Sequence, residues 1–257
     1  MGQVTATMGR TIKELLREKS SLFWTIGWPI IWVMIGSVSF VSSTPPEVQP
    51  YAKGSVTVPM MIFAVMIAGM SNLPASVAYD RERGMLSKLM SMPINPMKDF
   101  LGRILGLASF SCLAIVLVAL SGFALGARFR ADAADALVAV GFLVLVFICS
   151  AGIGTIIASL IKPVQGSIMT GVGISVISAA IGGMFTPLSY LPSFLQSFAK
   201  IYPVSIANSS ILYVLAGLDY SGYNPLTAGQ VTICLVITAL IMALGITLYS
   251  RVLWRRR

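Results

Sequence analysis

The decisive stretch of this sequence is Tyr79-Asp80-Arg81-Glu82-Arg83-Gly84-Met85-Leu86-Ser87-Lys88-Leu89-Met90-Ser91-Met92-Pro93, the densest cluster of charge between two long apolar runs. Its charged side chains are costly to place in hydrocarbon, so the stretch must lie in water or against a polar partner. Its apolar residues recur at helical spacing, and Pro93 ends the pattern. The stretch therefore predicts a short amphipathic helix, which is either a solvated loop that sets topology or a docking element for another protein.

The composition assigns the chain to the membrane class, because 56% of its residues are hydrophobic and only 11% are charged. A helical span needs roughly 20 predominantly apolar residues, whereas a membrane β-barrel would show short alternating segments. We therefore expect a single all-α transmembrane domain over residues 1–257. Six spans fit the uncharged runs, at about 22–41, 55–78, 100–123, 136–161, 164–185 and 227–250.

The distribution of basic residues predicts the orientation of these spans. With the amino terminus inside, 14 of the 18 Lys and Arg residues fall on the inner side, and the other 4 are Lys53, Arg128, Arg130 and Lys200. Short inner loops carry such an excess, so both termini are expected in the cytoplasm and the protein in the plasma (inner) membrane as a multi-pass protein. The net charge of +9 follows from this bias and favours membrane lipid as a partner, so no nucleic-acid partner is needed.

Two segments outside the spans have their own patterns. Residues 3–20 place an apolar stripe against a charged face, which predicts an interfacial helix; a signal peptide is the competing interpretation, but the run 22–41 is long for one. Residues 186–218 are apolar but are cut by Pro187, Pro192 and Pro203 into pieces too short to span. We expect these pieces to form a short re-entrant helical hairpin in the outer leaflet.

Spans 2 and 5 each carry a stripe of small and hydroxyl residues. Such a face is too polar for lipid and too small for a bulky core, so it should line a pathway or a subunit contact, and both alternatives stay open. The candidate pathway residues are Thr57, Met61, Ala64, Ala68, Ser71 and Asn72 in span 2 and Ser167, Gly171, Ser175, Ser178 and Gly182 in span 5.

Two stretches, in the right order, resemble signatures of type-2 ABC exporter permeases. Asp80-Arg81-Glu82-Arg83-Gly84, followed by Leu86, Leu89 and Met92-Pro93, resembles the pattern E-R-E-x-G-T-L-E-x-L-x-x-x-P after the second span. Phe185-x-Pro187-Leu-x-x-Leu191-Pro192 through Tyr202-Pro203 resembles the block F-P-L-x-x-L-P-x-W-L…N-P before the last span. Phe194 stands near the usual tryptophan and Tyr202 where asparagine is common, which leaves the subfamily open between drug or lipophile efflux and polysaccharide export.

This resemblance implies a coupling helix at 79–92 that docks into a separate ABC ATPase subunit, of which two copies are expected. It also implies pairing with a second permease copy or a sister permease, with the pathway on the two-fold axis between spans 2 and 5. The implied coupling residues are Tyr79, Asp80, Arg81, Glu82, Arg83, Gly84, Met85, Leu86 and Leu89, and the implied outer gate is Phe185, Pro187, Leu191 and Pro192.

The sequence offers little for a catalytic function. It has no histidine, and its cysteines, Cys112, Cys149 and Cys234, lack metal-ligand spacing, so we expect no catalytic residue and no metal site. It also lacks G-x-x-x-x-G-K-[ST], so ATP and Mg are expected on the partner ATPase and no cofactor on this chain. An ion-coupled secondary transporter would usually carry an acid at mid-span, which is missing here. An uncharged pathway favours a lipophilic or amphipathic substrate, drug-like or lipid, with polysaccharide or glycolipid export as the alternative.

Overall fold

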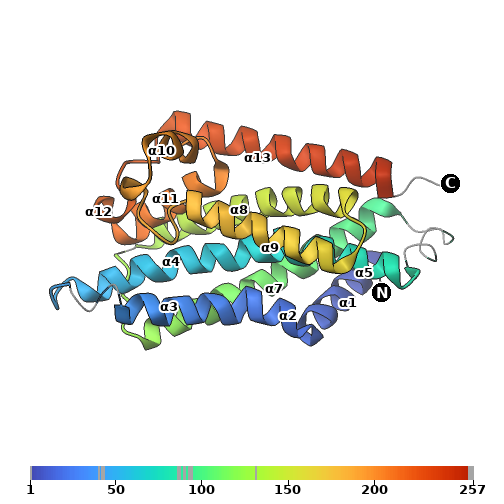
Figure 1. The fold of residues 1–257 in the computed structure, drawn as a ribbon, viewed down its shortest axis with the longest axis horizontal. Coiled ribbons are helices and arrows are strands. Elements are labelled where there is room, and N and C mark those ends of the chain that lie inside the picture. The colour runs from blue at the N-terminus through green and yellow to red at the C-terminus, as the bar shows by residue number, and fades with distance from the viewer. Residues whose placement is uncertain are drawn as a thin grey trace.

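The computed structural model describes residues 2–39, 41, 44–85, 88, 91, 95–130 and 132–253. Across these residues the secondary structure is helical, without a strand, and the helices form an elongated bundle (Figure 1). The helix α1 (Gln3–Arg17) and the end of α13 (Ala228–Leu248) lie at one end of this bundle, and α10 (Ser193–Ala199) lies at the other. The expected all-α architecture is confirmed.

Six helices in the described part are long and apolar enough to cross a membrane, which confirms the predicted number of spans. Some of them are continuous across a short π-helical segment. Span 1 is α2 (Lys19–Leu22), η1 (Phe23–Gly27) and α3 (Trp28–Ser39); span 2 is α4 (Gln49–Ile67), η2 (Ala68–Asn72) and α5 (Leu73–Glu82); span 3 is α7 (Pro96–Ala124); span 4 is α8 (Ala133–Leu160); span 5 is α9 (Val164–Ile181); and span 6 is α13, which continues into η4 (Tyr249–Leu253).

Several span boundaries differ from the prediction: span 2 begins at Gln49 rather than 55 and span 3 at Pro96 rather than 100, and two further differences have a cause in the local structure. Span 5 ends at Ile181 rather than 185, because the chain turns at Gly183, whose φ of 72° favours glycine. Span 2 does not end at Ala78; its helix continues through Glu82, so Tyr79–Glu82 form the last turn of α5 rather than the start of a separate helix. The charged residues of this turn find partners within the chain, which lets the helix continue.

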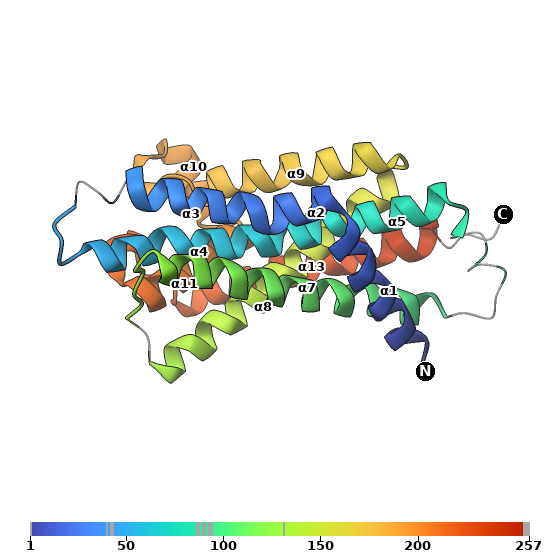
Figure 2. The ribbon, with the colours of Figure 1, turned by 90° about the horizontal axis from the view of Figure 1, so that it is seen from below.

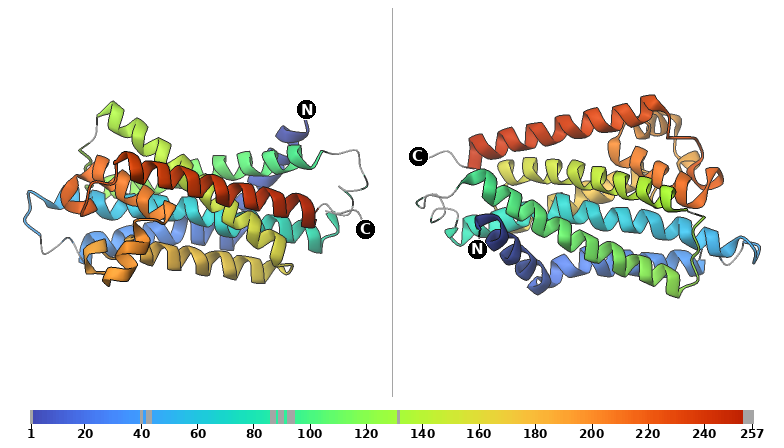
Figure 3. Two further views of the ribbon diagram at one scale, coloured as in Figure 1. Left: turned by 90° about the horizontal axis from the view of Figure 1, so that it is seen from above. Right: turned by 180° about the vertical axis from the view of Figure 1, so that it is seen from behind.

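Span 2 is the central helix of the bundle. Of the 18 most apolar consecutive residues of span 2, 89% are buried inside this one chain, whereas the corresponding share for span 6 is 17%. α4 packs against α3, α7, α8 and α11 (Pro203–Ala216), whereas α13 lies at the edge of the bundle along α8 (Figure 3). In the chain by itself, span 2 therefore contacts protein on nearly all sides.

The segment between spans 5 and 6 consists of short helices, as expected. They are η3 (Leu188–Tyr190), α10, α11 and α12 (Leu218–Ser221), and α10 and α11 meet at an angle of 86°. Pro203 begins α11, where its missing N–H costs no helical hydrogen bond. A bent helix pair before the last span is therefore confirmed.

Two of the π-helical segments have a common cause. η1 ends two residues before Pro29 and η2 ends two residues before Pro74. A proline inside a helix lacks the N–H and crowds the carbonyl four residues earlier, which widens the preceding turn. The two widened turns contact each other, because Asn72 Nδ2 donates to Thr25 Oγ1 at 3.0 Å and both side chains are buried.

The amino-terminal helix α1, predicted to be interfacial, crosses the end of α7 that carries Asp99 and Arg103 obliquely (Figure 2). The two helices approach closely because α7 presents glycines there. A Cβ on Gly102 would lie 2.7 Å from Val4 O, and one on Gly106 would lie 2.9 Å from the Thr11 Cβ. The small residues spaced by four in span 3 therefore pack α1 onto the bundle.

Candidate functional site

Asp80 lies at the centre of a buried ionic network at the charged end of the bundle. Arg103 of α7 and Arg10 of α1 both donate to Asp80 Oδ2. The Arg103 side chain is only 1% exposed; its Nε also donates to Asp99 Oδ2 at 2.9 Å and its Nη1 to Ser76 Oγ at 3.0 Å. A buried guanidinium needs such carboxylate partners to offset its desolvation. The network therefore joins α1, α5 and α7.

Arg81 and Glu82 hold the tight turn between spans 4 and 5. Arg81 donates to Ala158 O at 3.1 Å and to Ile161 O at 3.2 Å, where the last carbonyls of α8 have no partner within the helix. Glu82 Oε1 accepts from Val164 N at 2.9 Å, at the first turn of α9. The Arg81 cation thus caps the C-terminus of α8, and the Glu82 anion caps the N-terminus of α9. Helix dipoles favour this placement of charge.

The residues that follow face outward. Arg83, at the end of α5, is exposed and lies with its guanidinium 5.2 Å from the ring centroid of Tyr79. Gly84 has a φ of 66°, which ends the helix, and Met85 is 38% exposed. Leu86 and Leu89, the other predicted coupling residues, lie outside the described residues. Within the described part of the predicted coupling stretch, the exposed residues that do not bind the turn between spans 4 and 5 are Arg83, Met85, Lys88 and Ser91, and these are free to contact another protein.

The polar stripes of spans 2 and 5 meet each other inside the chain. Ser71 Oγ donates to Ile168 O at 3.3 Å, and a Cβ on Gly171 would lie only 2.2 Å from Met70 O. Ser175 and Met70 lie in the same contact, with Oγ and Sδ 3.5 Å apart. That these two stripes line a transport pathway stays a prediction. Within this chain the predicted pathway residues that are buried are Thr57, Ala64, Ala68, Ser71, Asn72, Ser167, Gly171, Ser175, Ser178 and, in part, Gly182, and Met61 is partly buried.

The residues predicted as an outer gate lie at the end of the bundle that carries α10. The Phe185 ring packs against Trp32 at 5.0 Å and Phe63 at 6.0 Å between ring centroids. Pro187 and Leu191 flank η3, and Pro192 precedes α10, with both prolines exposed. Of these four residues the structure thus brings Phe185 into an aromatic cluster, and the role of a gate stays a prediction.

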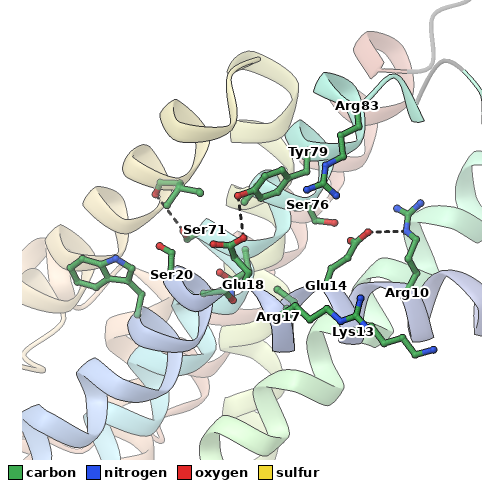
Figure 4. A pocket seen from close by; sticks show the side chains of 16 residues that line it. Arg10, Lys13, Glu14, Arg17, Glu18, Ser20, Ser71, Ser76, Tyr79 and Arg83 are labelled. Atoms are coloured by element: carbon green, nitrogen blue, oxygen red, sulfur yellow. Dashed lines mark hydrogen bonds and ion pairs between the residues drawn. The ribbon is translucent and has the colours of Figure 1, made fainter.

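A cavity of about 540 Å³ lies at the opposite end of the bundle, beside the ionic network around Asp80. It is enclosed by α1, α2, span 2 and α9. Figure 4 shows Arg10, Lys13, Glu14 and Arg17 of α1 on one side of it and Ser76, Tyr79 and Arg83 of span 2 on the other. Glu14 pairs with Arg10 at 3.4 Å, and burial raises the pKa of Glu14 even though Arg10 opposes this shift. The Tyr79 hydroxyl donates to Glu18 Oε2 at 3.3 Å.

Sequence reasoning missed the cavity and the network around Arg103. One signal was present for the network, because Asp99 and Arg103 are charged residues four apart at the start of an apolar run. Such a pair lies on one helix face and needs partners when a span buries it. The cavity had no such signal, since its walls come from helices far apart in the chain.

Comparison with known proteins gives two concordant findings. The model of the ABC-2 type transporter family matches residues 2–216. The chain is also similar to a probable doxorubicin resistance ABC transporter permease protein from two strains of Mycobacterium tuberculosis. Each of these relatives is 23% identical over 246 residues, which cover 93% of this chain and 88% of the relative.

Proposed function

Because the chain belongs to the ABC-2 type transporter family, we propose that it is the membrane-spanning permease of an exporter driven by a separate ABC ATPase, assembled from two permease and two ATPase chains. As a multi-pass permease it needs a docking surface for the ATPase. The observation that carries the proposal is the outward-facing Arg83–Gly84–Met85 turn between spans 2 and 3, at the end of the bundle where basic residues gather. Its partly exposed methionine offers the adaptable apolar contact that a groove on a partner can enclose.

The proposed substrate is a lipophilic or amphipathic compound. The spans that the family arrangement places around the pathway carry small and hydroxyl residues rather than charges. The relatives from Mycobacterium tuberculosis are named for resistance to a drug, which supports efflux of drug-like compounds by this chain.

Replacing Met85 with aspartate tests the docking surface. An unpaired carboxylate in an apolar contact must be desolvated, and truncating or mispairing a buried interface group costs about 2–5 kcal/mol, so the ATPase is expected to be lost from the purified complex. Co-purification of the ATPase and substrate-stimulated ATP hydrolysis measure the effect. Met97→Asp is the matched control, because Met97 is also exposed and at the same end but lies in the first turn of α7. Normal ATPase recovery and export by Met85→Asp would refute docking at this turn.

The proposed orientation places the charged end and both termini in the cytoplasm. Single cysteines at exposed positions test it in a background without Cys112, Cys149 and Cys234: Glu47→Cys and Asn224→Cys at one end of the bundle, and Ser91→Cys at the other. A membrane-impermeant maleimide should label the first two in intact cells and Ser91→Cys only after permeabilisation. Labelling of Ser91→Cys in intact cells would reverse the orientation.

A further inference from the structure

The 540 Å³ cavity beside α1 has an excess of positive charge. Four basic side chains line it, Arg10, Lys13, Arg17 and Arg83, against two acidic ones. The two carboxylates already have partners, since Glu14 pairs with Arg10 and Glu18 accepts from Tyr79.

Three of the four cations have no carboxylate partner among the described residues. Lys13, Arg17 and Arg83 are exposed, and none of them forms an ion pair within the described part of the chain. Arg10, by contrast, is held by Asp80 and Glu14. The unpaired charge of the cavity is therefore entirely positive, which selects an anionic group.

The interior of the cavity supplies polar groups for such a ligand. Ser21 is 7% exposed, and its Oγ has no hydrogen-bond partner within the described structure. A buried hydroxyl without a partner is costly, so a ligand that accepts a hydrogen bond there would be favoured. Ser20 adds a second hydroxyl to the same wall.

An apolar path leads away from the cavity along span 1. Trp24 lines the cavity, and its ring packs 5.8 Å from Trp28, which packs 6.2 Å from Trp32. All three indoles are partly exposed, on successive turns of one helix face. A hydrocarbon chain could lie along this tryptophan face while a polar head stays at the charged end, as amphiphiles do at a membrane interface.

We propose that the cavity binds the anionic headgroup of an amphiphile from the adjoining leaflet, with Lys13, Arg17 and Arg83 around the head and the tail along Trp24, Trp28 and Trp32. The proposal rests on the proposed function in that this end of the bundle faces the cytoplasmic leaflet, which is rich in anionic lipid. A membrane phospholipid and an anionic amphiphilic cargo share this chemistry.

Fluorescence quenching by brominated lipid tests the binding. The full chain is reconstituted in nanodiscs with Trp24 as its only tryptophan, through Trp28→Phe, Trp32→Phe and Trp254→Phe; phenylalanine keeps an apolar ring at 28 and 32, where the tail is proposed to lie. Brominated phosphatidylglycerol is expected to quench Trp24 at a concentration at least about tenfold lower than brominated phosphatidylcholine, since each nearby cation contributes to anionic-lipid binding. Lys13→Gln with Arg17→Gln should abolish this preference.

A matched control removes the same charge elsewhere. Lys19→Gln with Lys98→Gln neutralises two exposed basic residues at the same end of the bundle that do not line the cavity, and it should leave the preference intact. Equal quenching by the two lipids, or a preference that survives Lys13→Gln with Arg17→Gln, would overturn the proposal. Loss of the preference in both pairs would also overturn it, because the membrane-surface charge alone would then explain the binding.

Addition of ATP to the complex with its ATPase distinguishes the two sources of the ligand. A cargo would stimulate ATP hydrolysis and move phosphatidylglycerol to the outer leaflet, whereas a resident lipid would keep quenching Trp24 through turnover without being moved. Both results support the site. Because the quenching itself needs no ATPase, it stays readable even if no ATPase partner exists and the proposed function fails.

Discussion

Replacing Arg103 with alanine is expected to destabilise the protein more than any other single change to its charged residues. The guanidinium is buried and serves two carboxylates, on Asp99 and Asp80. Its removal leaves Asp80 with Arg10 and Asp99 with the Thr7 hydroxyl at 3.2 Å. Breaking a buried ion pair from one side costs about 3–5 kcal/mol, and here Asp99 is left without a cation among the described residues. The midpoint of thermal unfolding in detergent should fall sharply, and little folded protein should accumulate.

Two further variants separate this effect from a general loss of positive charge. Arg17→Ala removes an exposed arginine at the same end and should leave the unfolding midpoint almost unchanged, as exposed charges contribute about 0–1 kcal/mol. Arg103→Ala combined with Asp99→Asn removes the uncompensated charge and should recover part of the lost stability. An unfolding midpoint of Arg103→Ala equal to that of the unchanged protein would show that the network contributes nothing.

The second large effect is expected at Gly171, where spans 2 and 5 touch. A Cβ there would lie 2.2 Å from Met70 O and 2.5 Å from the Ser71 Cα, and these backbone atoms of η2 cannot move aside without distorting span 2. Gly171→Ala should therefore push α9 away from η2 and break the hydrogen bond from Ser71 to Ile168. Overpacking of this kind costs about 1–3 kcal/mol, and more where the obstacle is backbone.

Gly173, two residues further along the same helix, is the matched control. A Cβ at Gly173 would meet no atom within 4 Å, so Gly173→Ala should be neutral or should stabilise the helix by up to about 1 kcal/mol. Thermal unfolding of the two variants measures the packing effect, and export activity shows whether the contact between spans 2 and 5 is needed for transport. Equal stability of both variants would contradict the close approach of these spans.

Several features of the fold could be predicted from the chain alone, because each depends on a run of neighbouring residues. The thickness of the hydrocarbon layer and the cost of burying charge decide where a span can lie, so the six spans could be predicted from the uncharged apolar runs. The prolines at 187, 192 and 203 likewise predicted the short helices before span 6, because a proline disrupts the interior of a helix.

The roles of the charged residues after span 2 could not be separated in this way. In the sequence, Asp80, Arg81, Glu82 and Arg83 are equivalent members of one cluster. In the structure three of them serve the chain itself, and Arg83 remains on the surface near Met85. Their partners lie 23 to 82 residues away along the chain, so no local pattern identifies them.

The sequence by itself determined the membrane class, the number of spans and the resemblance to exporter permeases, because composition and motif are properties of consecutive residues. Only the tertiary structure decided which charges are buried, which face is left for a partner, and where the cavity lies. The physical reason is that a charge is stabilised or left unpaired by the atoms around it in space. For Asp80 and Lys13, which lie at the same end of the bundle, those atoms differ: two guanidinium groups contact the first, and the second lines a cavity without an ion-pair partner among the described residues.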